Sequence, residues 1–550
     1  MNTVIIKTIS PTAAIKPLVV ATAVLSLTAC STLTKTFENR IPPSQQPNQV
    51  LAEPNLPINQ PYQLTAMDNK TVSQANQPSV AAERWQDYYS DPKLKALISI
   101  ALQNNKDLES AILAVKSAEA QYQITQISNI PRANITGGAN RLATNARDKN
   151  SSSAFNVNLG MANYEFDFWG KIANLKDQAL QTYLGTTAAK DAAQISLIST
   201  IAQTYVNYSY ALAQLQLAES TVNSRQKSLQ ITKARFNAGI DSKAPSLQAE
   251  SLLQNAKLAA YNAQTSLLQL RNAMQYLIGS PVPENLYPAP HVSNITNHKV
   301  FSAGLPSELL YYRPDVLQAE YKLKAAGANI AVARANYFPS ISLTGRMGYS
   351  STNLKQLFKT SAFGWSFGPS ISVPLFDAGQ LDANYQVAQI ARKQALTGYE
   401  KSIQAAFKEV ADVLAARATL EERLETQYRL QDNFQQMYTI ADARYKAGLD
   451  SYLSVLDAQR SEFSSQQSIL NLEKAKAMSQ VQLYQALGGG VTIDTPVTLT
   501  VPNHKKPVAF IAPKTPYYTS DKKPIENHGN PARLSSTAKV GTVEQVNQLK

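Results

Sequence analysis

Two hydrophobic patterns alternate along the chain, and each occurs in both halves. The first places apolar residues three and four positions apart, which is typical of helices that pack along a narrow stripe. The second alternates apolar and small polar residues, which is typical of strands with two different faces. The clearest example of the helical pattern consists of Leu396, Tyr399, Ile403, Phe407, Val410 and Leu414. In each half the order predicted is helix, hairpin, long helix, helix.

The alternating pattern predicts two β-hairpins, over 131–169 and 339–377. In the second hairpin, Phe363, Trp365 and Phe367 alternate with glycine and serine. In the first, the alternation changes phase between Met161 and Tyr164, which predicts a bulge or a strand end near Ala162.

Long stretches without proline follow each hairpin, from Lys171 to Asn237 and from Gln380 to Lys446. If continuous, each would form a helix of about 100 Å. A further helix is predicted after each of them, over 247–278 and 452–487. Gly239 and Gly448 occupy equivalent turns, 209 positions apart, so the chain is predicted to be an internal duplication.

The patterns divide the chain into six segments. Residues 1–29 are predicted to be a signal peptide and residues 30–91 an extended arm. Residues 490–550 are predicted to form a segment of a small equatorial region around the helices, followed by a basic, disordered tail. The first repeat spans 92–279, a connector spans 280–305, and the second repeat spans 306–489.

The apolar run 18–27 ends in Leu-Thr-Ala-Cys, which resembles the lipobox of bacterial lipoproteins. Cys30 is the one cysteine of the chain, and its place predicts acylation, with palmitate among the lipids. The alternative is a buried cysteine after an ordinary signal peptide. Ser31, rather than aspartate, follows Cys30. By resemblance to bacterial lipoproteins, the lack of aspartate at this position favours the outer over the inner membrane.

Composition and charge narrow the functional classes. The net charge is +13, but lysine and arginine are scattered without an aromatic platform, so no nucleic-acid partner is expected. The four histidines lie in connector or tail segments, and no catalytic triad, metal motif or phosphate loop is present. The chain is therefore predicted not to be an enzyme and to need no cofactor. Seven methionines are too few to suggest a relay for copper or silver.

Hairpins with one apolar and one polar face fit an outer membrane, where the apolar face can meet lipid. Four strands cannot close a barrel alone, and open sheet edges are not tolerated in lipid. Three chains would supply twelve strands. Helices of about 100 Å would have to stand in the periplasm, packed side by side.

Five motifs stand out by their order and spacing. They are the lipobox, Arg-Pro-Asp-Val at 313–316, Tyr-Phe-Pro-Ser-Ile-Ser-Leu at 337–343, Val-Pro-Leu-Phe-Asp-Ala-Gly at 373–379 and Tyr-Leu-Ser-Val-Leu-Asp-Ala-Gln-Arg at 452–460. Together they resemble the motifs of the TolC/OprM-type outer-membrane efflux channels, in particular their lipoprotein (NodT-like) branch.

The resemblance implies an α+β membrane protein: a homotrimer with a 12-stranded β-barrel in the outer membrane and an α-helical barrel in the periplasm. It also implies two partners, a periplasmic adaptor (membrane fusion) protein and an inner-membrane RND-type pump. The function implied is a passive conduit that expels drugs or other toxic compounds. Two alternatives remain open, a type I secretion channel and a non-transporting trimeric spacer or adhesin of the envelope.

The resemblance also places Leu453, Asp457 and Tyr445 at a periplasmic gate, where three chains converge and close the tunnel. Leu453 and Asp457 are four residues apart and therefore share one helix face. An apolar ring would resist wetting, and a carboxylate ring would favour cations. The alternative is that Leu453 packs between helices and that Asp457 is an ordinary exposed acid. In the first repeat the equivalent residues are Ala244 and Gln248.

Overall fold

The computed structural model describes residues 84–143, 151–293, 295–296 and 313–490, with the side chains of residues 143, 151 and 162 left out. The predicted signal peptide, Cys30 and the predicted C-terminal tail lie outside these ranges. The described residues all belong to the first of two units into which the chain divides, Met1–Asp494.

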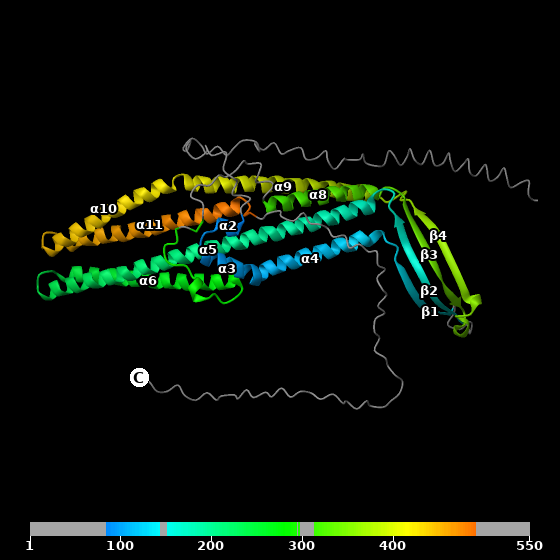
Figure 1. The fold of residues 1–550 in the computed structure, drawn as a ribbon, viewed down its shortest axis with the longest axis horizontal. Helices are drawn as coiled ribbons and strands as arrows, with labels where there is room; N and C mark the ends of the chain where they lie inside the picture. Colours follow the sequence, from blue (N-terminus) through cyan, green and yellow to red (C-terminus); the bar gives the residue numbers. More distant parts are fainter. Residues whose placement is uncertain (1–83, 144–150, 294, 297–312, 491–550) are drawn as a thin grey trace, which may run out of the picture. The chain divides into compact units, whose positions relative to one another are not determined.

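The first half contains a short helix, two helices, a hairpin and two long helices (Figure 1). Their bounds are α2 Trp85–Tyr88, α3 Pro92–Asn104, α4 Lys106–Gln126, β1 Ala133–Ala143, β2 Ser151–Phe166, α5 Lys171–Asn237 and α6 Lys243–Ile278. Short 3-10 turns follow α4 (η3, Ile127–Asn129) and α6 (η4, Glu284–Leu286).

The second half repeats this order from α8 onward. Its elements are α8 Pro314–Ala335, β3 Ser340–Ser351, the turns η5 Leu354–Gln356 and η6 Thr360–Ala362, β4 Phe363–Ser372, α9 Gln380–Ala418, α10 Leu420–Lys446 and α11 Tyr452–Ala486. The predicted long helix after the first hairpin is continuous, and α5 has 67 residues. At 1.5 Å per residue it is about 100 Å long.

Local signals in the sequence explain several helix ends. Asp91 caps α3 by accepting a hydrogen bond from the Lys93 amide at 2.8 Å, and Pro92 occupies the first helical turn. The Asn105 side chain caps α4 in the same way, with the Leu108 amide as donor at 2.9 Å. Gly279 ends α6 in the left-handed conformation, with φ of 72°.

The second long stretch differs from the first because it is two helices. Thr419 separates α9 from α10 and has φ −109° and ψ −1°. Neither glycine nor proline marks this break in the sequence. The absence of proline from 380 to 446 therefore did not guarantee a single helix.

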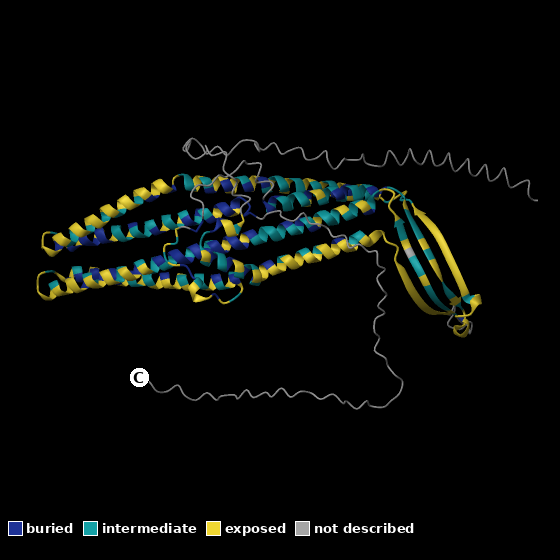
Figure 2. Cartoon of the chain, in the orientation of Figure 1, coloured by how far each residue is buried: buried dark blue, intermediate teal, exposed yellow. Residues whose placement is uncertain are grey.

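The four strands form one antiparallel sheet in the order β1-β2-β3-β4, so the two hairpins are joined through β2 and β3. The pairing of β2 with β3 shifts between Met161 and Tyr164, which confirms the predicted bulge. Asn163, inside the shift, has a positive φ of 50°. β1 and β4 are the outer strands, and Figure 2 shows β4 exposed along its length.

The register gives the sheet two chemically different faces, because directly opposed residues point to the same side. One row runs across all four strands through Ile135, Leu159, Met347 and Trp365. The next row runs through Thr136, Asn158, Gly348 and Gly364. The first set belongs to an apolar face and the second to a polar face, as the alternation predicted.

The largest core lies among α3, α5, α6 and α11, and it includes the ring of Tyr484. Tyr88 and Tyr89, assigned to the arm in the sequence, are fully buried there, with ring centroids 4.8 and 5.4 Å from that of Tyr484. Trp85, seven residues before Pro92, also packs against this core, so contact with the helices begins within the predicted arm. Within the described residues, no helix is both long enough and apolar enough to cross a membrane.

Candidate functional site

Two tight turns lie at the ends of the long helices that are opposite the sheet (Figure 1). One turn joins α5 to α6 and the other joins α10 to α11. Gly239 and Gly448 have φ of 72° and 74°, the left-handed conformation that glycine adopts without strain. This confirms the helix break predicted at 448–451.

Each turn is held by an arginine-aspartate pair of the same geometry. Arg235 donates from Nε to Asp241 at 2.8 Å and from a terminal nitrogen at 3.4 Å. Arg444 donates to Asp450 in the same way, at 2.6 and 3.2 Å. The two pairs are related by the 209-residue offset, so the duplication preserved the clasp as well as the turn.

Tyr445 adds a link that only the second repeat makes. Its hydroxyl donates to Asp241 Oδ2 at 2.7 Å, and the Arg235 guanidinium lies 4.9 Å from the centre of its ring. The equivalent residue of the first repeat is Phe236, which is exposed and has no hydroxyl. Tyr445 therefore joins the two turns through a hydrogen bond to a charged acceptor, a strong class of hydrogen bond.

These contacts shift the pKa values of the groups involved. The hydrogen bonds from Arg235 and then Tyr445 lower the pKa of Asp241. The hydrogen bond from Arg444 lowers the pKa of Asp450. Burial, followed by the hydrogen bond to Asp241, raises the pKa of Tyr445, which stays protonated as a donor.

An apolar cluster lies directly behind the turns and draws on both repeats. Its buried members are Leu229, Ala249, Leu252, Leu253, Tyr445, Tyr452, Val455 and Leu456. Behind it, the buried Arg225 donates to the Gln459 carbonyl at 3.1 Å, which fixes α5 against α11. Burial lowers the pKa of Arg225 and raises that of Glu462.

The structure places the three predicted gate residues in two environments. Tyr445 is 4% exposed and faces the first repeat. Leu453, 57% exposed, and Asp457, also exposed, lie on a different face of α11 from the buried Tyr452 and Leu456. Asp457 makes no hydrogen bond or ion pair with any residue that the structure describes. Leu453 and Asp457 thus project away from this chain's own core.

Sequence reasoning missed Arg235, Asp241 and Arg225 as contributors to this region. The first two were visible as an arginine six residues before an aspartate, repeated at the duplication offset. Arg225 left no such signal, because Phe434 stands at its equivalent position.

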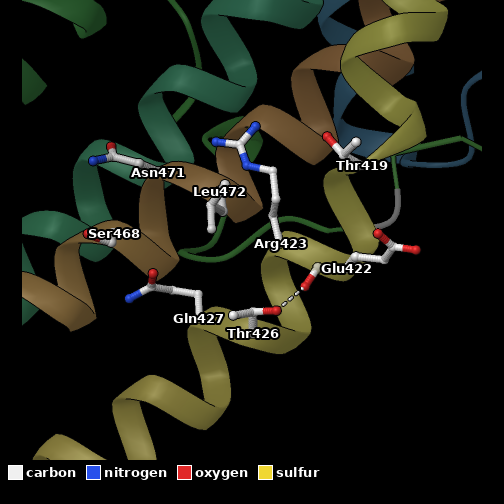
Figure 3. Close-up of a pocket in the computed structure, with 8 residues that line it drawn as sticks. All are labelled: Thr419, Glu422, Arg423, Thr426, Gln427, Ser468, Asn471 and Leu472. Atoms are coloured by element: carbon white, nitrogen blue, oxygen red, sulfur yellow. Dashed lines mark hydrogen bonds between the residues drawn. The ribbon is translucent and has the colours of Figure 1, made fainter. Parts of the chain in front are cut away.

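A second feature is an open polar cavity of about 630 Å³ beside the break between α9 and α10 (Figure 3). It is lined by Thr419, Glu422, Arg423, Thr426, Gln427, Ser468, Asn471 and Leu472. Gln427 is held by a 2.9 Å hydrogen bond to the Ser465 hydroxyl. Nowhere in the described ranges do three or more His, Cys, Asp or Glu side chains gather as metal ligands would.

Comparison with known families gives a match over both repeats. The model of the family described as "Outer membrane efflux protein" matches residues 97–280 and 305–489. The gap between the two matched stretches falls in the connector.

Named relatives align over most of the chain. It is 40% identical to the toluene efflux pump outer membrane protein TtgI of Pseudomonas putida, over 76% of this chain and 90% of that protein. It is 37% identical to the cation efflux system protein CusC of Escherichia coli, over 80% and 94% respectively.

Solved structures agree with these alignments. A crystal structure of CusC superposes with a TM-score of 0.71 at 35% identity, covering 82% of this chain and 99% of that one. The open state of the Neisseria gonorrhoeae MtrE outer membrane channel gives 0.70 at 34% identity, covering 82% and 98%.

Proposed function

Because this chain belongs to the outer membrane efflux protein family, we propose that three copies of it form a continuous, passive efflux conduit. The barrel would hold twelve strands, four from each chain, and would stand in the outer membrane. The long helices would form the periplasmic part. A periplasmic adaptor and an inner-membrane RND-type pump would complete the system, and acylated Cys30 would anchor each chain.

The observation that carries this proposal is the sheet. Its strands have 11, 16, 12 and 10 residues, enough for tilted strands to cross a bilayer. Trp365 is 76% exposed and Ile135 is 73% exposed, both on the apolar face. β1 and β4 have no strand on their outer sides within the described residues. Pairing of β4 with β1 of another copy would satisfy both edges and close the sheet.

The helices also present apolar side chains that this chain alone leaves uncovered. Examples are Leu113 on α4, Leu258 on α6 and Ile440 on α10, each 55–59% exposed. Exposed apolar surface spread along three helices favours contact with neighbouring copies. This distribution supports a helical barrel built from several chains.

The gate would lie at the two turns. Leu453 and Asp457 would form an apolar ring and an acidic ring, because both project from the exposed side of α11. Tyr445 would act differently, by holding the second turn against the first through Asp241. Only one helix pair per chain carries these residues, so the ring would contain three aspartates.

The relatives' names favour efflux over secretion, since they refer to toluene and to cations. Their substrates differ, however, while the scaffold is shared. The substrate of this chain would therefore be decided largely by the pump that it serves.

The test is a deletion of the gene in a strain whose partner pump is intact, followed by measurement of dye and antibiotic accumulation. Accumulation should rise and return to normal when the full chain is restored. Unchanged accumulation would refute the efflux function.

The gate is tested separately, with the purified full chain in planar bilayers. Leu453→Ala should raise ion conductance, and Asp457→Ala should change the conductance and weaken its preference for cations. Ala244→Gly and Gln248→Ala, at the equivalent positions of the first repeat, serve as matched controls. Equal conductance in all four variants would refute the gate assignment while leaving the conduit intact.

A further inference from the structure

One arginine stands in the middle of the polar face of the sheet. Arg346 lies on β3, opposite Gly160 on β2 and Ser366 on β4, and it is exposed. Its neighbours along the same face of β3 are Thr344 and Gly348. Glycine, serine and threonine are short, so these four neighbours do not cover the guanidinium; the nearest longer side chain of β2 on this face is Asn158, opposite Gly348.

The nearest acid on this face is far away and already paired. Within the described strands, the polar face carries two charged side chains, Arg346 and Glu165. Glu165 lies opposite Ser342, four residues along β3 from Arg346, which corresponds to about 13 Å. It forms an ion pair with Lys171 at 3.2 Å. Arg346 makes no ion pair with any described residue.

The guanidinium is also oriented. Arg346 donates from Nε to the Ser366 hydroxyl at 3.0 Å, across β3 and β4. That contact leaves the two terminal nitrogens without a hydrogen bond to any described residue. Such a pair of donors fits the two oxygens of a carboxylate, or of another oxyanion, in a bidentate arrangement.

We propose that Arg346 is a specificity-determining residue of the conduit. The three Arg346 side chains, one from each chain, form a cationic ring that attracts oxyanions inside the barrel. The inference rests on the proposed function, because the polar face becomes the wall of the lumen only when the apolar face meets lipid. A ring of fixed charge in a pore raises the local concentration of the opposite charge. At physiological salt this acts over about 8 Å, so it is local to the middle of the barrel.

The ring differs in sign from the one proposed at the helix tips. Asp457 would favour cations there, whereas Arg346 would favour anions within the sheet. A zwitterionic or anionic organic molecule that had passed the tip would therefore find a complementary site in the barrel, which would discourage its return.

The experiment places a reporter cysteine beside Arg346 in the full chain in the outer membrane. Thr344→Cys lies on the polar face, two residues away, and is reached from outside the cell whether or not the helix tips are closed. The probes are an anionic sulfonatoethyl and a cationic trimethylammonioethyl thiosulfonate, and labelling of the parent chain is subtracted as background.

With Arg346 present, the anionic probe should react faster relative to the cationic one than it does in the Arg346→Gln variant. A ring potential of about one kT acts with opposite sign on the two probes, so Arg346→Gln should lower the ratio of their rates about sevenfold. Arg346→Lys should keep most of the preference. In 1 M salt, where screening acts within about 3 Å, the difference should largely disappear.

Met347→Cys, on the apolar face, separates the two hypotheses. It should stay unlabelled by both probes if that face meets lipid. Labelling of Met347→Cys as fast as Thr344→Cys would refute the orientation of the barrel and with it the proposed function. Labelling of Thr344→Cys alone, with a ratio unchanged by Arg346→Gln, would refute only the cationic ring. If Arg346→Gln fails to assemble, Arg346→Ser, which matches Ser342 and Ser350 on the same face, takes its place.

Discussion

At the scale of single residues, the helix tips show how the two repeats of a duplicated scaffold differ. Both repeats keep the arginine-aspartate clasp, but only one of them has a tyrosine beside it. The hydroxyl of Tyr445 turns two separate clasps into one network. Leu453 and Asp457 are likewise confined to the second repeat. Tyr445, Leu453 and Asp457 thus distinguish the second repeat from the first where the proposed gate lies.

Removal of the Tyr445 hydroxyl should loosen the contact between the turns. Tyr445→Phe keeps the ring in its apolar cluster but removes a hydrogen bond to a carboxylate, which contributes about 1.5 to 3 kcal/mol. If that bond favours the closed tip, open probability in planar bilayers should rise about tenfold or more, since 1.4 kcal/mol corresponds to a factor of ten.

Tyr438→Phe is the matched control, because Tyr438 packs against the same cluster and its hydroxyl makes no hydrogen bond to a described residue. Equal open probability in the two variants would contradict the role given to the Tyr445 hydroxyl.

Acid should loosen the same contact. In the folded state the pKa values of Asp241 and Asp450 are lowered. Their ion pairs therefore stabilise the folded state at pH values above the unfolded-state pKa of about 3.9. The stabilisation is lost as pH falls through the lowered folded values. Conductance measured from pH 7 downward should therefore rise below about pH 4.

Asp241→Asn should raise conductance already at pH 7 and flatten its rise in acid. Asp450→Asn should have the smaller effect, since Asp450 closes only its own turn. A conductance that is steady down to pH 3 in the unaltered chain would contradict this account.

At the scale of helices and strands, the periodic patterns predicted most of the fold. Sequence reasoning located both hairpins, the bulge between Met161 and Tyr164, and α5, because each rests on many residues that repeat one signal. It missed the break at Thr419, where no glycine or proline gives a local signal. It also left Tyr88 and Tyr89 in the arm, since their burial depends on contacts with Tyr484, almost 400 positions away.

The candidate site was predicted less completely for the same reason. Leu453 and Asp457 share a helix face because of their spacing, which sequence reveals. The partner of Tyr445 lies in the other repeat and depends on how two turns meet. The spacing of residues within one repeat gives no information on the distance between the two turns.

Two glycines of neighbouring strands should respond differently to the same substitution. A Cβ on Gly348 of β3 would strike the backbone of β2, at the Val157 carbonyl and at 2.6 Å from Asn158 Cα. Gly348→Ala should therefore force β2 and β3 apart and destabilise the sheet by about 1 to 3 kcal/mol. The measurement is the temperature at which the folded protein, extracted from the outer membrane, loses its sheet.

Gly364→Ala on β4 is the control, because nothing lies within 4 Å of the Cβ that it would add. Its melting temperature should stay close to that of the unaltered chain. If both alanine variants melt together, the close approach of β2 to Gly348 does not limit stability.

At the scale of the whole molecule, a single chain leaves strand edges unpaired and apolar surface uncovered within its described residues. It has a sheet with two open edges and helices with uncovered apolar side chains. Each deficiency would be met by other copies of the same chain, at the sheet by edge pairing and along the helices by side-to-side packing. A closed ring is the arrangement that leaves no copy at an end.

Ring closure can be tested by linking β1 of one copy to β4 of the next. Thr136→Cys on β1 would be combined in turn with Ser366→Cys, Gly368→Cys and Ser370→Cys on β4, all on the polar face. Within one chain β2 and β3 separate these strands, and neighbouring strands lie about 4.8 Å apart, so the two positions are at least about 14 Å from each other. A disulfide needs Cα atoms within about 7 Å and can therefore form only between copies.

Oxidation of at least one pair should give covalent trimers on denaturing gels. Each single-cysteine variant should remain monomeric, because two copies of one position never face each other in the ring. Dimers and open ladders without a trimer limit, or no linkage for any of the three pairs, would contradict a closed ring of three chains.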